Sequence, residues 1–379
     1  RSALVALNEG VITPEYGYPC GGRYTLCGHG KPQCTHAGNG HAANVRLSIA
    51  NSCNAYYAHV YRLTVDNPKY GNVKNGYLQW KKYMNTFGLG VRLGLDIPNE
   101  ISGLIPDTSV YNRENANYWT SCTNLTLGIG QDKMLTTPLQ MANAMCIIAN
   151  RGYYYTPHFV EKIDGETADD TTLVNRFRVK HDVLTHIPDT AFSAVIEGMN
   201  DVVKFGTARV AQIPGIDVCA KTGTAENYTI LDGRRIKLPN NSMFVCFAPK
   251  DNPKIAIAVF VQNAGYGATW AGPISRLMVE KFLNDTLMTK SKADLERISK
   301  TNLMPAYFKR VQFKEDSIRA FKWYQTTKDS SYIKRYVKTA PKQPPNPADK
   351  KQPVHVADEW MAILPDRNPF LKTMNSKRS

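Results

Sequence analysis

The chain has 379 residues, of which 42% are hydrophobic and 10% aromatic, values that belong to a globular protein and exclude a disordered one. The net charge of +15 is uneven, because residues 286–379 carry 20 Lys and Arg against 9 Asp and Glu (+11), while residues 1–285 carry 27 against 23 (+4). The sequence has no apolar run of about 18 residues, so it predicts no transmembrane helix.

The first half of the chain predicts helices separated by polar loops. Residues 3–10 have the pattern of an apolar helix that ends at a glycine, and residues 14–42 form a loop rich in Gly, Cys and His. Helical signals at 43–63 are interrupted by a polar turn, which would project Ser52 and Asn54 toward a cleft. Further helices are predicted at 76–87, 136–148 and 189–204.

The second half predicts antiparallel strands and a closing helix. A strand at 217–221 leads into a Lys-Thr-Gly turn, and residues 243–248 and 254–262 have the composition of neighbouring strands. Residues 274–283 then form a helix. Helices followed by a late run of antiparallel strands indicate an α+β fold.

Three segments follow from composition. Residues 1–285 form the body, and residues 286–340 form a basic extension with an amphipathic, aromatic-containing helix at 307–325. Residues 341–379 form a Pro- and Lys-rich tail that we expect to be disordered. The basic tail is interpreted as a solvated arm or as a segment attracted to anionic lipid headgroups or polyanions. Nucleic-acid binding is the least favoured interpretation.

The eight cysteines form no regular framework. One glycine-rich loop contains Cys20, Cys27, Cys34, His29, His36 and His41. These residues could supply four tetrahedral ligands to a structural zinc, although the loop lacks a tight C-x2-C pair. Alternatively, two of these cysteines form a disulfide in an oxidising compartment, or the loop has neither a zinc ion nor a disulfide. Small core residues are expected at Cys53, Cys122, Cys146, Cys219 and Cys246.

Two short motifs carry the predicted chemistry. Ser52 and Asn54 flank one residue in a turn, where the hydroxyl could relay a proton and the amide could hold a peptide carbonyl. Lys221 follows Ser52 by 169 residues (221 minus 52). Either motif alone is weak, since Ser-x-Asn is usually a helix cap or a turn.

The residues after Lys221 suit a ligand that lies along a strand. Lys221 offers a positive charge, and the hydroxyls of Thr222 and Thr224 could bind a carboxylate. Gly223 leaves room for a ligand beside the strand, so substrate would dock antiparallel to its edge.

Together these motifs resemble class B penicillin-binding proteins, and among them the elongation transpeptidases of the penicillin-binding protein 2 type. The likeness spans about residues 3–285 and includes the segments 128–131, 137–142, 221–226, 242–249 and 267–271. It implies the penicillin-binding transpeptidase fold, which is β-lactamase-like, with a five-stranded antiparallel sheet flanked by helices and an all-helical lobe. Asp132 and Lys133 depart from the usual pattern of that family.

The resemblance also implies roles for single residues. Ser52 would belong to a proton relay with Lys221, and Asn54 would hold the acyl-donor peptide. Lys221 with the hydroxyls of Thr222 and Thr224 would bind the carboxylate of the donor or of a β-lactam. The backbone N–H of Thr224 would supply half of the oxyanion hole.

The implied activity is serine-type D-Ala-D-Ala transpeptidation, which cross-links peptidoglycan stem peptides during cell elongation. The implied partners are a lipid-linked precursor, β-lactams and a polytopic membrane glycosyltransferase of the elongation machinery, with no nucleic acid and no required cofactor. The catalytic domain would face the periplasm from the inner membrane.

The nucleophile of this family stands in a Ser-x-x-Lys motif, expected roughly 50–60 residues before Ser52. We therefore expect the chain to be a fragment that begins just after this motif and that is inactive alone. A β-lactam sensor or β-lactamase-like hydrolase, a D,D-carboxypeptidase and a non-catalytic penicillin-binding scaffold are the alternative functions.

Overall fold

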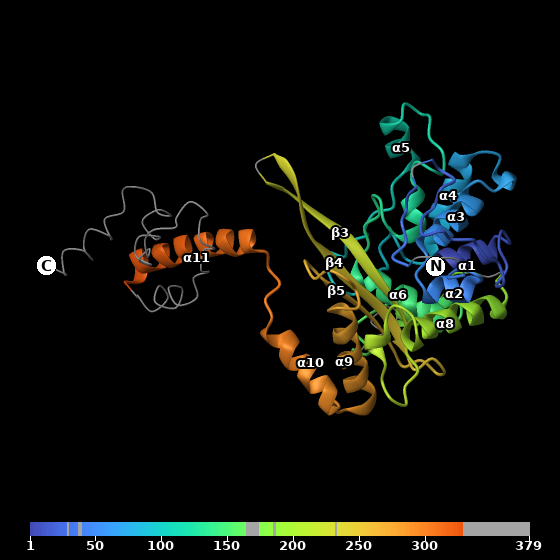
Figure 1. The fold of residues 1–379 in the computed structure, drawn as a ribbon. Coiled ribbons are helices and arrows are strands. Elements are labelled where there is room, and N and C mark those ends of the chain that lie inside the picture. The colour runs from blue at the N-terminus through green and yellow to red at the C-terminus, as the bar shows by residue number, and fades with distance from the viewer. Residues whose placement is uncertain (29, 37–39, 164–173, 185–186, 232, 329–379) are drawn as a thin grey trace. The chain divides into compact units, whose positions relative to one another are not determined.

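The described residues of the computed structural model (Figure 1) are 1–28, 30–36, 40–163, 174–184, 187–231 and 233–328. The chain divides into two compact units, residues 1–301 and residues 302–379. The segment 341–379, predicted to be a tail, lies outside the described residues.

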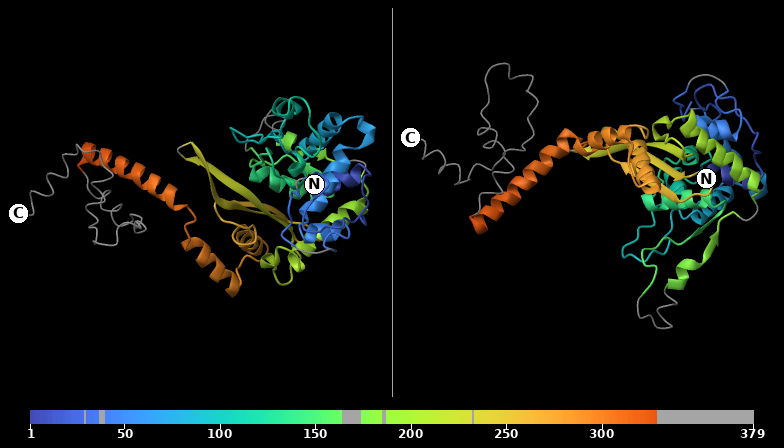
Figure 2. Two further views of the ribbon diagram at one scale, coloured as in Figure 1. Left: turned by 45° about the horizontal axis from the view of Figure 1, so that its top comes forward. Right: turned by 90° about the horizontal axis from the view of Figure 1, so that it is seen from below.

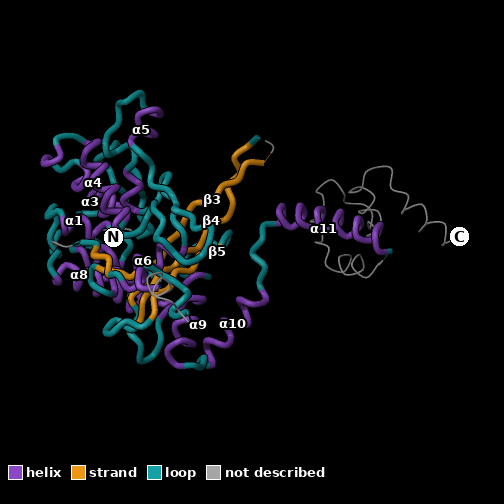
Figure 3. The backbone as a smooth tube through the Cα atoms, turned by 180° about the vertical axis from the view of Figure 1, so that it is seen from behind, coloured by secondary structure: helices purple, strands orange, loops and turns teal. Residues whose placement is uncertain are grey.

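Helices make up most of the first unit before residue 212. They are α1 (Ser2–Asn8), α2 (Val45–Ala50), α3 (Asn54–Val65), η1 (Pro68–Tyr70), α4 (Val73–Thr86), α5 (Thr108–Glu114), η2 (Leu125–Ile129), α6 (Pro138–Ala149), η3 (Arg176–Arg178), α8 (Asp189–Lys204) and η4 (Arg209–Ala211). A small hairpin pairs β1 (Tyr153–Tyr155) with β2 (Lys180–Asp182). The later elements are β3 (Cys219–Leu231), β4 (Arg234–Ala248), β5 (Ile255–Val261), α9 (Ala271–Asn284) and α10 (Thr289–Lys300). Figure 3 shows how the helices surround the strands.

The strands β3, β4 and β5 form one antiparallel sheet with helices on both faces (Figures 1 and 2). Cys219 on β3 faces α8, because its thiol lies 3.6 Å from the carbonyl oxygen of Ile196. Its partner on β4 is Phe247. Phe244, three residues earlier on β4, points to the other face of the sheet, where a β-carbon added to Gly272 of α9 would lie 3.4 Å from the Phe244 ring. The sheet is thus a layer between α8 and α9, which confirms a mixed fold of helices and antiparallel sheet.

The predicted turn at Lys-Thr-Gly is wrong. Strand β3 runs straight through residues 221–224, paired with β4, and continues to Leu231. The register shifts between Ala225 and Asn227, which forms a β-bulge opposite Pro239 of β4. Proline is tolerated there because the ladder of hydrogen bonds is interrupted. Beyond this bulge β3 and β4 pair without β5, and we call residues 227–231 and 234–238 the arm. The described sheet has three of the five strands that the resemblance implies.

Several helix predictions are confirmed. The interruption falls between α2 and α3, where Cys53 is the N-cap of α3 and its sulfur accepts from the backbone N–H of Tyr56. Helix α6 starts with a capping box formed by Thr137 and Gln140, with Pro138 in its first turn. Helices α5 and α10 are not predicted, because their sequences are too polar to show a clear apolar periodicity.

Close packing joins α2 to α8. A β-carbon added to Gly198 of α8 would lie 2.9 Å from the carbonyl oxygen of Arg46, so no larger residue fits without movement. The Arg46 guanidinium forms an ion pair with Asp201, whose side chain is only 2% exposed. This hydrogen-bonded pair raises the pKa of Arg46. The helix that leads to Ser52 is therefore fixed to the helix that covers the sheet.

The second unit begins at residue 302, and its described part contains α11 (Ala306–Thr327). Residues 307–325 are helical as predicted, but the prediction that this helix is amphipathic is wrong, because its apolar side chains are spread around α11 and do not gather on one face. Across the described part of both units, no helix combines the length and the apolar run needed to cross a bilayer.

Candidate active site

The two predicted motifs meet in space. The Nζ atom of Lys221, on β3, donates a hydrogen bond to the Oγ atom of Ser52 at 2.6 Å, across 169 residues of sequence. A second bond joins the same Nζ atom to the carbonyl oxygen of Thr222 at 3.0 Å. Burial lowers the pKa of Lys221 to about 8, so its amine can exist in both protonation states near neutral pH.

Ser52 is held in an unusual conformation. Its φ of 53° lies in the left-handed region, which costs a non-glycine residue about 1–3 kcal/mol. The surrounding turn maintains it, since the N–H of Ser52 donates to Ile49 and the N–H of Cys53 donates to Ser48. The turn between α2 and α3 thus presents the Ser52 hydroxyl to β3.

Asn54 shares this turn but has a different partner. Its amide nitrogen donates to the backbone carbonyl oxygen of Gln33 at 2.7 Å, which lies in the cysteine-containing loop. Asn54 therefore connects the Ser52 turn to that loop in this conformation. The same NH2 group has a second hydrogen, which could donate to a peptide carbonyl.

The two threonines of β3 have neighbours that the sequence did not identify. The hydroxyl of Thr222 lies 2.9 Å from the hydroxyl of Thr207, which follows α8. The carbonyl oxygen of Thr224 accepts a long bond, 3.5 Å, from the side chain of Gln131. Gln131 belongs to the Gly-rich segment of the resemblance, whereas nothing in the local sequence singles out Thr207.

Gly223 lies under a second glycine. A β-carbon on Gly267 would lie 2.7 Å from the carbonyl oxygen of Gly223, closer than real β-carbons approach other heavy atoms. A β-carbon on Gly223 itself would lie 3.3 Å from that of Met243 on the neighbouring strand. Gly267 therefore allows the loop before α9 to pack directly on the backbone of the Lys-Thr-Gly strand, whereas a side chain at Gly223 would crowd Met243.

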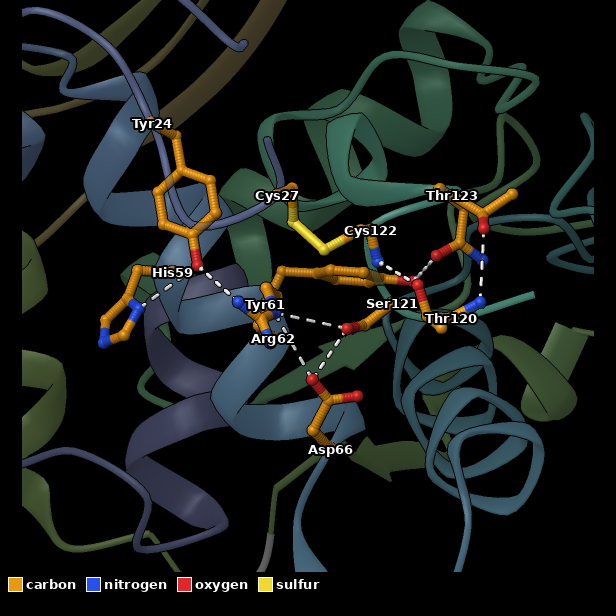
Figure 4. The surroundings of a disulfide bond; sticks show 11 residues. Tyr24, Cys27, His59, Tyr61, Arg62, Asp66, Thr120, Ser121, Cys122 and Thr123 are labelled. Atoms are coloured by element: carbon orange, nitrogen blue, oxygen red, sulfur yellow. Dashed lines mark hydrogen bonds and ion pairs between the residues drawn. A yellow bond between two sulfur atoms is a disulfide. The ribbon is translucent and has the colours of Figure 1, made fainter. Parts of the chain in front are cut away.

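A disulfide fixes the cysteine-containing loop to the helical part of the unit (Figure 4). It joins Cys27 to Cys122, 95 residues later. Nearby, Arg62 on α3 donates to the hydroxyls of Tyr24 and Ser121. The interpretation of Cys27 as a zinc ligand is therefore wrong, because its sulfur is bonded to that of Cys122. The interpretation of Cys122 as a free core residue is also wrong, because it forms this disulfide and is only half-buried.

A second cluster lies directly behind Ser52. The ligand atoms of Cys20, Cys34, His36 and Cys53 all lie within 4.8 Å of one another. The cluster includes Cys53, the residue between Ser52 and Asn54, which the sequence analysis placed in the core. His29 lies outside the described residues, and the ring of His41 lies beside that of His36 at a centroid distance of 4.5 Å, tilted by 36°.

The cluster has the chemistry of a metal site. The sulfurs of Cys20 and Cys34 are 3.6 Å apart and those of Cys34 and Cys53 are 4.0 Å apart, close to the edge of about 3.8 Å expected for a tetrahedron of thiolates around zinc. Both ring nitrogens of His36 are buried without a hydrogen-bond partner among the described residues. Hydrogen bonding with Cys53 lowers the pKa of the Cys34 thiol to about 5. These four side chains could hold a metal ion.

Known proteins resemble this chain over most of its length. The family model for the penicillin-binding protein transpeptidase domain matches residues 2–280. The peptidoglycan D,D-transpeptidase MrdA of Haemophilus influenzae is 28% identical over 319 residues, which cover 79% of this chain and 46% of that protein. The chain thus spans about half the length of this curated relative.

Solved structures share the fold. The crystal structure of Pseudomonas aeruginosa PBP2 in complex with WCK 5153 has a TM-score of 0.61 and 26% identity, covering 76% of this chain and 59% of the other. A peptidoglycan synthase complex that coordinates polymerization and crosslinking has a TM-score of 0.56 and 25% identity, covering 76% and 45%. These matches agree with the family model.

Proposed function

Because the chain belongs to the penicillin-binding protein transpeptidase family, we propose that the protein containing it is a peptidoglycan D,D-transpeptidase of the elongation type. The observation that supports this proposal best is the 2.6 Å hydrogen bond between Lys221 and Ser52. Two motifs that are weak in isolation form one polar site. We also propose that the complete sheet has the five strands of the family, of which the described residues contain three.

In the proposed reaction, a serine outside these motifs attacks the carbonyl carbon between the two terminal D-alanines of a donor peptide. A C–O bond to the enzyme forms, the C–N bond breaks, and the serine proton reaches the leaving amine. Ser52 and Lys221 would carry that proton, for which a Lys pKa of about 8 is suited because the amine can accept and return it near neutral pH. An acceptor amine then attacks the ester carbonyl carbon. A new C–N bond forms, the C–O bond to the serine breaks, and a proton from the amine returns to the serine oxygen.

Binding of the donor would use the strand β3. Its terminal carboxylate would meet the cationic Lys221 and the hydroxyls of Thr222 and Thr224, and Asn54 would hold a peptide carbonyl. The N–H of Thr224 would donate to the oxyanion, an interaction whose loss typically costs about 3–4 kcal/mol of transition-state stabilisation. A β-lactam would enter the same site through its own carboxylate.

The location and partners follow from the same proposal. The Cys27–Cys122 disulfide supports an oxidising, extracytoplasmic compartment, which is where peptidoglycan is cross-linked. We propose a periplasmic domain anchored to the inner membrane, acting on lipid-linked precursor beside a polytopic glycosyltransferase. The similarity to a synthase complex that couples polymerization to crosslinking supports such a partner.

We also propose that the cluster of Cys20, Cys34, His36 and Cys53 binds structural zinc. The ion would replace the repulsion of crowded thiolates with bonds to one cation, and it would fix Cys53, which separates Ser52 from Asn54. These residues would therefore position the turn, and no step of acyl transfer needs the metal.

Labelling with a fluorescent penicillin tests the main proposal. The gene product that contains this chain should form a band that survives denaturing gel electrophoresis, because the acyl-enzyme bond is covalent. Absence of the band from the gene product would favour a non-catalytic scaffold. Many turnovers per second of a chromogenic cephalosporin would instead indicate a β-lactamase-like hydrolase.

A further inference from the structure

The arm is a two-stranded extension of the Lys-Thr-Gly strand (Figures 1 and 2). Strand β5 ends where Val261 pairs with Ser242, so no third strand accompanies the arm in the described sheet. Its base is fixed, because the side chain of Asn227 donates to Pro239 and to Asn263. The arm therefore leaves the body at a defined point and does not contribute to the core.

One face of the arm combines cations with apolar groups. Residues that are directly opposite in an antiparallel pair share a face, and this places Tyr228 with Lys237 and Ile230 with Arg235. The Arg235 guanidinium lies 3.9 Å from the ring centroid of Tyr228, and Ile230 is 74% exposed. Neither cation forms an ion pair with a carboxylate of the described residues. The hydroxyl of Tyr228 donates to the carboxylate of Glu226 at 3.1 Å, so one acidic group borders this face. The two cations still give the face a net positive charge, which fits an anionic ligand that also offers apolar contact.

The position of the face follows from the direction of docking. A peptide that adds antiparallel to β3, with its C-terminal carboxylate beside Thr222 and Thr224, sends its earlier residues toward the arm. Tyr228 is four residues beyond Thr224, or about 13 Å along the strand, and a peptide residue three positions before its C-terminus lies about 10 Å away. A long cationic side chain such as that of Lys237 can cover the difference.

We propose that the face of the arm formed by Tyr228, Ile230, Arg235 and Lys237 binds the carboxylates that a stem peptide carries upstream of its terminal D-alanines. This inference rests on the proposed transpeptidase function and names a part of the substrate that a β-lactam lacks. Continuity with the Lys-Thr-Gly strand favours a stem peptide over an anionic membrane, since the arm prolongs the edge on which the donor would lie.

The test compares two peptides and two variants on the 379-residue chain. The ligands are a stem pentapeptide with free upstream carboxylates and the same peptide with these carboxylates amidated, and ligand-observed NMR measures their dissociation constants. We expect Arg235→Gln/Lys237→Gln to weaken the free acid about fivefold to tenfold and to leave the amidated peptide unchanged. Arg234→Gln, on the opposite face of the arm, is the matched control and should change neither.

The outcomes separate the possible failures. Equal weakening of both peptides, or an equal effect of Arg234→Gln, would overturn the proposal. Loss of binding to vesicles containing anionic lipid, with unchanged peptide affinity, would assign the face to a membrane. Absence of penicillin labelling of the gene product would refute the proposed function itself, whatever the arm variants show.

Discussion

The ion pair between Arg46 and Asp201 predicts an asymmetric response to mutation. The carboxylate of Asp201 is 2% exposed, whereas the side chain of Arg46 is 50% exposed. Removing the arginine leaves a buried charge without its partner, which typically costs about 3–5 kcal/mol. Removing the charge from the aspartate costs less, about 1–2 kcal/mol, because the freed guanidinium can be hydrated and an amide oxygen can still accept a hydrogen bond.

Thermal and urea unfolding of the chain measure this difference. At about 2–4 °C per kcal/mol, Arg46→Ala should lower Tm by at least about 6 °C. Asp201→Asn should lower it by about half as much or less. The double variant Arg46→Ala/Asp201→Asn should be more stable than Arg46→Ala alone, because the stranded charge has been removed with its partner.

A surface pair supplies the matched control. Lys281 and Asp285 form an i, i+4 pair in which both side chains are largely exposed, so Lys281→Ala should change the unfolding free energy by no more than about 0.5 kcal/mol. If Arg46→Ala were no more destabilising than Asp201→Asn, burial of the Asp201 carboxylate would not govern the stability of this pair, and the predicted asymmetry would be refuted.

Three further predictions concern the site. Binding of a carboxylate ligand should weaken as pH rises through about 8, because Lys221 loses its charge there. The variant Lys221→Arg should extend binding to higher pH. An affinity that stays constant from pH 7 to 9 would contradict this prediction. Gly267→Ala should displace the Lys-Thr-Gly strand and reduce penicillin acylation of the gene product by at least about tenfold, whereas Gly21→Ala, where the added carbon meets no atom within 4 Å, should not. The purified chain should contain about one zinc by elemental analysis, and Cys34→Ser should lower both zinc content and Tm while Cys146→Ser retains the metal.

The contact between Ser52 and Lys221 was predicted by the resemblance to penicillin-binding proteins, because a spacing of 169 residues alone carries no information about proximity. The sequence could not predict that Cys53 joins Cys20 and Cys34, since that contact depends on how a loop folds over a helix N-terminus. The pairing of Cys27 with a residue 95 positions away was equally inaccessible, because spacing within the loop carries no information about it.

The boundaries of the strands also depend on long-range pairing that the local sequence does not reveal. The Lys-Thr-Gly segment has a glycine and small polar residues, so local propensity indicated a turn, yet pairing with β4 overrides it. Pro239 within a strand-like run could have indicated the bulge. Helix α10 was missed because it buries little and is stabilised by its neighbours, including the carboxylate of Glu280, which accepts from Ser291 and from the N–H of Met288.

Cys53 lies between two proposed substrate-handling residues yet faces away from them, into the sulfur cluster. Its side chain is therefore constrained by residues 20, 34 and 36 and not by the reaction. Among related sequences, the residue between the serine and the asparagine should covary with those three positions, and chains that have lost the cluster should be free to place another small residue there. Replacement of Cys53 during evolution would then follow, or accompany, loss of the other cysteines of the cluster.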